Sequence, residues 1–102
     1  MQVRHFCFTY NNYEKVTEWK DKLIESLQSL GANYYIWGVE IAPSTGTPHL
    51  QGYVQLEKRK AFNVVVKSLP GCHITRCLGS SQDNINYCNK ECSNVVIYGI
   101  VS

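Results

Sequence analysis

The sequence predicts an α+β fold, a sandwich of βαββαβ order with a mostly antiparallel sheet. Three observations predict it. β-Rich and amphipathic runs follow one another in this order, at residues 5–10, 14–30, 34–41, 49–57, 61–68 and 72–78. A length of 102 residues suits one domain with its own core. No apolar run approaches the roughly 20 residues of a membrane span. We therefore expect one domain over residues 1–102, with helices on one face of the sheet and the other face open.

The first half of the chain has clear start and stop signals. The strand at residues 5–10 ends at Asn11 and Asn12, whose side chains favour turns. The run at 14–30 repeats apolar residues at helical spacing, and Gly31 is a typical helix stop. The strands at 34–41 and 49–57 are joined by a loop rich in Pro, Gly, Ser and Thr, which predicts a hairpin.

The second half continues the same ferredoxin-like or RRM-like order. A short helix at residues 61–68 ends before Pro70 and Gly71, and a fourth strand follows at 72–78. Ser80, with Asp83 three residues later, predicts the start of a further helix that runs to about Glu91. A last strand or edge segment is expected at 94–98.

Charge and cysteine content restrict the class of protein. The net charge is +2, but residues 57–102 carry six Lys/Arg against three Asp/Glu, whereas residues 1–56 carry four against five. The basic half is compatible with a polyanion partner or simply with a solvated surface. The N-terminus has no signal-peptide pattern, and the five cysteines are an odd number, so we expect an intracellular protein with free thiols.

A zinc site is one alternative use of the cysteines. It would draw on Cys72, Cys77, Cys88 and Cys92. If residues 72–78 form a strand, however, Cys72 and Cys77 point to opposite faces and lie about 17 Å apart. The spacing therefore favours small core residues over zinc ligands.

The strand at 49–57 has two unlike faces. Leu50, Gly52, Val54 and Leu56 point one way, whereas His49, Gln51, Tyr53 and Gln55 point the other way. Glu40 lies near the end of the partner strand in the predicted hairpin, so Glu40, His49 and Gln51 can converge. One imidazole and two oxygen donors suit Mg²⁺ or Mn²⁺ better than zinc. The alternative is that Glu40 and His49 are ordinary polar residues at a hairpin end.

Tyr87 and Lys90 are a candidate nucleophile and its neighbour. They lie three residues apart and share a face of the last predicted helix. A tyrosine with a pKa near ~10 attacks an electrophile when a cation or a metal assists it. On spacing alone, the pair is more often the edge of an amphipathic helix.

Three short segments together resemble the replication-initiator endonucleases of circovirus type, which belong to the HUH superfamily. They are Phe8-Thr9-Tyr10-Asn11-Asn12, Pro48-His49-Leu50-Gln51-Gly52-Tyr53 and Tyr87-Cys88-Asn89-Lys90. They occur in the family's order with family-like spacing, and Glu40 falls at the family's distance before His49. In the second segment, Gln51 stands where the wider class has a second histidine. The resemblance covers essentially the whole chain.

This resemblance implies a site-specific endonuclease and strand-joining enzyme that initiates rolling-circle replication. Tyr87 would attack a stem-loop origin in single-stranded DNA, form a 5′-phosphotyrosine and free a 3′-hydroxyl, with Lys90 assisting. Glu40, His49 and Gln51 would hold Mg²⁺ or Mn²⁺. The resemblance suggests DNA contacts by phosphate charge and base stacking; the expected contacts are Phe8, Tyr10, Asn11, Asn12, Lys58 and Arg76.

The resemblance also implies a cellular setting and a longer protein. It places the protein in the host cell nucleus, without a membrane partner. The sequence lacks the Gly-x-x-x-x-Gly-Lys-Ser/Thr loop of the family's helicase domain. We therefore expect a nuclease domain excised from a longer, oligomeric protein, monomeric when isolated and without ATP-dependent unwinding.

A nucleic-acid-binding module without catalysis is the rival hypothesis. An RNA-recognition domain has the same βαββαβ order and presents stacking aromatics on its central strands. Phe6, Phe8, Tyr10 and Tyr53 could form such a platform. This hypothesis gives no reason for Glu40 and Tyr87 to accompany it.

Overall fold

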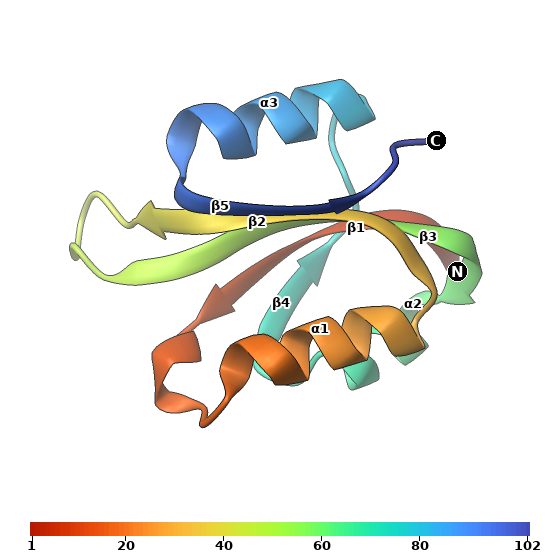
Figure 1. The fold of residues 1–102 in the computed structure, drawn as a ribbon, viewed down its shortest axis with the longest axis horizontal. Helices are drawn as coiled ribbons and strands as arrows, with labels where there is room; N and C mark the ends of the chain where they lie inside the picture. Colours follow the sequence, from red (N-terminus) through yellow and green to blue (C-terminus); the bar gives the residue numbers. More distant parts are fainter.

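A single five-stranded antiparallel sheet, in the order β4–β1–β3–β2–β5, forms the centre of the protein (Figure 1). This computed structural model describes all of residues 1–102. The strands are β1 (Gln2–Asn11), β2 (Ala32–Ile41), β3 (Pro48–Ala61), β4 (Cys72–Thr75) and β5 (Ser93–Gly99). The helices are the 3₁₀ turn η1 (Tyr13–Lys15), α1 (Trp19–Ser29), α2 (Phe62–Ser68) and α3 (Ser81–Glu91). The predicted α+β class and the order of its elements are confirmed.

The helices cover both faces of the sheet. Figure 1 shows α1 and α2 on one side and α3 on the other. Under α1 and α2, the main apolar core includes Leu50, Val54 and Leu56 of β3. Under α3, a smaller cluster surrounds Tyr53, which is fully buried. The expectation that the second face would be open is therefore wrong, because α3 packs its own apolar side against it.

The strand and helix boundaries differ from the predicted ones in three places. α1 begins at Trp19 rather than at residue 14, because the extended backbone at Val16 and the left-handed conformation of Glu18 separate η1 from the helix. β3 continues through the basic run to Ala61, beyond the predicted end at residue 57. β4 stops at Thr75, so residues 76–80 are a connection to α3 rather than strand.

The aromatic residues of the rival hypothesis are all inside the protein. Phe6, Phe8 and Tyr10 lie in the core beneath α1 and α2, while Tyr53 lies beneath α3. A base can stack only on an exposed ring, so these side chains form no platform. Phe8 and Tyr10 were expected to contact DNA. Their burial argues against this, because Phe8 is 0% exposed and Tyr10 only 8%.

The five cysteines are free and divided between the two faces. Cys72 packs beside the core under α1 and α2, whereas Cys7, Cys77 and Cys88 belong to the cluster under α3. Burial raises the pKa of Cys72 and of Cys88 to about 12, so both thiols stay protonated at neutral pH. The separation by the sheet supports a packing role for them. None of the helices has both the length and the apolar character needed to cross a bilayer.

A capping box fixes the start of α3, as the sequence predicts. The Asp83 backbone N–H donates to Ser80 Oγ at 3.1 Å, and the Ser80 N–H donates to Asp83 Oδ2 at 2.9 Å. Each bond satisfies a backbone donor that has no partner within the helix. These hydrogen bonds hold the pKa of the Asp83 carboxyl below its usual value.

Ser80→Ala should lower the free energy of unfolding by about 1 kcal/mol, because it removes the N-cap acceptor. Denaturant titration measures the loss, and Ser29→Ala on exposed α1 surface is the control, with almost no effect expected. The Asp83 pKa is lower in the folded state, so its contribution exists above the unfolded-state pKa and disappears as the pH falls through the folded-state pKa. A Ser80→Ala variant as stable as the wild type at neutral pH would contradict this account.

Candidate active site

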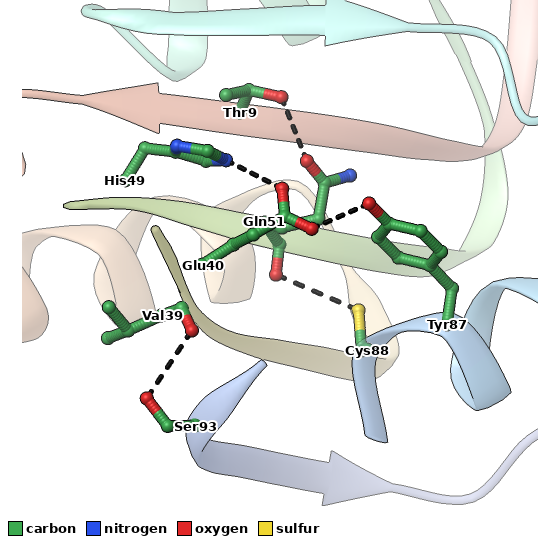
Figure 2. Close-up of polar contacts among 8 residues, drawn as sticks. All are labelled: Thr9, Val39, Glu40, His49, Gln51, Tyr87, Cys88 and Ser93. Atoms are coloured by element: carbon green, nitrogen blue, oxygen red, sulfur yellow. Dashed lines mark hydrogen bonds and ion pairs between the residues drawn. The ribbon is translucent and has the colours of Figure 1, made fainter. Parts of the chain in front are cut away.

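Glu40 and His49 meet at one end of the sheet, where β2 ends and β3 begins. The hairpin register pairs the two residues directly across the strands. Glu40 Oε1 lies 2.9 Å from His49 Nε2 (Figure 2), and both side chains are partly exposed. A metal bound to both residues would take the place of the proton between Nε2 and Oε1. The predicted convergence of these two residues is therefore present in the structure.

Tyr87 reaches the same carboxylate from α3. Its hydroxyl donates a hydrogen bond of 2.6 Å to Glu40 Oε2, the oxygen that His49 does not contact (Figure 2). The bond to Glu40, together with partial burial and nearby negative charge, raises the pKa of Tyr87 to about 12. The side chain is still 47% exposed, so a large substrate can reach it.

Gln51 lies on the same face of β3 and is oriented by Thr9 of β1. The two residues are paired in the β1–β3 register, and the Thr9 hydroxyl donates to Gln51 Oε1 at 3.1 Å (Figure 2). An amide oxygen has two lone pairs, so Oε1 can still bind a cation. The sequence analysis did not single out Thr9. Its period-two position in β1, on the face of Cys7 and Asn11, is the signal that points to it.

The donor atoms fit a divalent cation that prefers oxygen ligands. The set contains one carboxylate, one imidazole and one amide oxygen; no cluster of three or more His, Cys, Asp or Glu side chains occurs in the protein. Such a set lacks the nitrogen and sulfur ligands of a structural zinc site. It matches the hard, oxygen-rich character that Mg²⁺ and Mn²⁺ require.

The other predicted site residues lie at various distances from this cluster. Lys90 is exposed on α3 and forms no hydrogen bond or ion pair. Asn11 pairs with His49 in the β1–β3 register, and Asn12 is exposed beside it. Arg76 lies beyond β4, toward the opposite end of the sheet, where Arg59 rather than the predicted Lys58 shares a cavity with it.

Gly38 allows the C-terminal end of α3 to lie against the sheet. A Cβ at this position would overlap Cys92 Cβ and lie 3.1 Å from the Ser93 carbonyl oxygen. The chain therefore passes from α3 into β5 directly over β2. Cys88, one residue after Tyr87, is buried and makes a long contact of 3.7 Å from Sγ to the Gln51 carbonyl oxygen. Sequence patterns do not reveal this role of Gly38, because it depends on a tertiary contact.

A tyrosine hydroxyl beside a carboxylate and an imidazole is a candidate nucleophile with acid–base groups next to it. A family model described as "Putative viral replication protein" matches residues 3–91. The chain belongs to this family.

Curated relatives show the same similarity. The chain is 44% identical over 90 residues to the replication-associated protein of Human associated cyclovirus 1; the aligned segment covers 87% of this chain and 31% of the relative. It is 37% identical over 101 residues to that of Beak and feather disease virus, covering 97% of this chain and 33% of the relative. It is also 37% identical over 89 residues to that of Porcine circovirus 1, covering 86% and 28% respectively. The chain thus spans about a third of the length of these relatives.

Gly38→Ala should move the C-terminal end of α3 and destabilise the protein by about 1–3 kcal/mol, the usual cost of an extra methyl in a packed contact. The backbone at Gly38 has no positive φ, so the effect isolates the steric contact. Denaturant unfolding measures the free energy of unfolding, and the NMR signals of the Tyr87 ring report on its environment. A variant with wild-type stability and an unchanged Tyr87 signal would show that the contact does not hold α3.

Proposed function

We propose that this protein is a single-stranded DNA endonuclease and strand-joining enzyme that starts rolling-circle replication, with Tyr87 as nucleophile. The observation that carries the proposal is the shared carboxylate: Glu40 contacts His49 through one oxygen and Tyr87 through the other. The family match and the viral replication-associated relatives support the substrate class, DNA. Exposure of Tyr87 supports a polymeric substrate.

In the proposed reaction, the Tyr87 oxygen attacks a backbone phosphorus of the strand. A phosphotyrosine bond forms, the bond from phosphorus to the 3′-oxygen breaks, and the departing 3′-oxygen takes a proton from water to become a free hydroxyl. Glu40 Oε2 is the acceptor nearest to the phenolic proton, at 2.6 Å. Attack by a 3′-hydroxyl on the phosphotyrosine reverses the step and joins two strands.

Glu40, His49 and Gln51 are the residues that would hold Mg²⁺ or Mn²⁺. The bound cation supplies Lewis-acid polarisation of a phosphate oxygen. Thr9 orients the Gln51 amide by donating a hydrogen bond to its oxygen. Lys90 lies three residues after Tyr87 on α3 and adds positive charge on the side of the helix that the strand approaches.

Tyr87→Phe should abolish a covalent protein–DNA adduct while changing strand affinity by no more than about threefold, because only one hydroxyl is lost. The assay incubates the protein with Mn²⁺ and stem-loop oligonucleotides of randomised loop sequence, followed by denaturing gel electrophoresis. Tyr98→Phe is the matched control, since Tyr98 is similarly exposed on β5. It should form the adduct at the wild-type level.

The position of the label tests the direction of cleavage. A 3′-labelled strand should yield labelled protein, whereas a 5′-labelled strand should yield a shorter free fragment. The opposite distribution would contradict a 5′-phosphotyrosine. Wild-type protein that binds the strands but forms no adduct with any divalent metal would overturn the nuclease proposal and favour a binding module.

Gln51→Ala should weaken Mn²⁺ binding about tenfold or more, the scale seen when groups around a metal site are lost. Isothermal titration calorimetry on the protein alone measures the affinity without relying on activity. Gln28→Ala, an exposed glutamine on α1, is the control and should bind Mn²⁺ like the wild type. Equal affinity in the Gln51 and Gln28 variants would remove Gln51 from the ligand set.

A further inference from the structure

A polar cavity lies on the sheet face that carries the candidate active site, at the end of the sheet opposite to that site. It has a volume of about 390 Å³, and its lining includes Arg4, His5, Arg59 and Arg76 together with Gln55 and Ser81. His5 and Gln55 are paired across β1 and β3, six residues along each strand from the Asn11–His49 pair. At about 3.3 Å per residue, the cavity is about 20 Å from the active site.

None of the three arginines at this cavity forms an ion pair, either with an acidic side chain or with the carboxylate of Ser102. No Asp or Glu lines the cavity. Arg4 uses one donor, Nε, for the Leu56 carbonyl at 3.2 Å, while Arg59 and Arg76 form no hydrogen bonds. Guanidinium groups turned toward one cavity repel one another unless an anion lies between them, and phosphate is the anion that their forked donors match best.

The floor of the cavity is a connected polar network that leads to α3. Gln55, only 6% exposed, donates through Nε2 to the Tyr53 hydroxyl at 3.0 Å and to Ser81 Oγ at 2.9 Å. The Tyr53 hydroxyl donates to Ser81 Oγ at 2.8 Å and lies 3.1 Å from His5 Nδ1. Ser102 closes the network, since its backbone N–H donates to Gln55 Oε1 at 3.0 Å.

The network lines the cavity beside the arginines and joins its floor to α3. Ser81 is the first residue of α3, so the positive end of the helix dipole also lies at the cavity. Figure 1 shows that α3 begins near the end of the sheet where β1 starts and runs toward the β2–β3 loop. The helix thus connects the cavity to Tyr87, which lies six residues, or about 9 Å, further along it.

We propose that this cavity binds a backbone phosphate of the same DNA strand, a few nucleotides away from the phosphate that Tyr87 attacks. The inference rests on the proposed function for the identity of the strand. Arg59 and Arg76 clamp the phosphate, and Arg4 and the α3 N-terminus add positive charge. The site holds the path of the strand on the protein by charge and reads no base.

The test compares the wild type with the double variant Arg59→Gln/Arg76→Gln in binding a labelled single strand at several salt concentrations. Each phosphate contact contributes about 0.7 to the slope of log K against log salt for a single strand, so the variant, which loses the single phosphate contact of the cavity, should lose about 0.7 of slope. The control Lys20→Gln/Lys67→Gln removes the same charge from exposed helix surface outside the cavity and should keep the wild-type slope. All four side chains are exposed, so the variants should fold.

Strands shortened on either side of the cleavage point identify the contact. One of the two truncations should reduce wild-type affinity to that of the double variant, and the double variant should bind the intact and truncated strands equally. Equal slopes for the double variant and the lysine control would overturn the inference. The inference would also be overturned if the cavity bound a free mononucleotide through the arginines while neither double variant changed the affinity for the single strand.

Failure of this inference can be told apart from failure of the nuclease proposal. Arg59 and Arg76 are far from Tyr87, so the double variant should still form the covalent adduct when DNA is saturating. If the wild type forms no adduct, the nuclease proposal fails, whereas the salt slopes still decide whether the cavity holds a phosphate. If the adduct forms and the slopes do not differ, only the cavity assignment fails.

Discussion

The carboxylate of Glu40 is the contact on which the geometry of the site depends. It joins two parts of the chain that are far apart in sequence: the β2–β3 hairpin, which pairs Glu40 with His49, and α3, which carries Tyr87. Each carboxylate oxygen serves one partner. A charged acceptor makes stronger hydrogen bonds than a neutral one, so a glutamine there would hold neither partner as firmly. The hairpin register therefore determines whether the nucleophile and the imidazole can meet.

The position of α3 is fixed at both ends, and this matters because Tyr87 lies between them. At its start are the capping box and the network of Gln55, Tyr53 and Ser81; at its end the missing side chain of Gly38 lets the helix approach β2. Between these points only Ile85 and Cys88 are buried. Such a narrow apolar side gives little orientation by itself, so polar and steric contacts must supply the precision that a reacting group needs.

Local patterns predicted the residues of the site better than the way they are assembled. The alternation along β3 identified His49 and Gln51, and the loop between the strands implied that Glu40 lies opposite His49. The placement of α3 over the second face did not follow, because two buried residues on a polar helix are too few to indicate which surface they cover. Phe8 and Tyr10 were misread because aromatic residues are typical of strands whether their faces are buried or exposed. Arg59 was missed in favour of Lys58, because Lys58 was chosen from the basic run as a whole; counting by two from Gln55 leads to Arg59, which lines the cavity with it.

The layout of this face suits the proposed action on one bond of a long flexible strand. The two polar ends of the face are separated by the buried ring of Tyr53, and α3 spans them with Ser81 at one end and Tyr87 toward the other. A single strand held only at the reacting phosphate would be free to pivot about that point. A second phosphate held in the proposed cavity about 20 Å away would fix the path of the strand past Tyr87, because the distance between the two sites is set by the strands β1 and β3. Phosphates repeat at every nucleotide, so stem-loop geometry and base contacts would still have to choose which nucleotide lies at Tyr87.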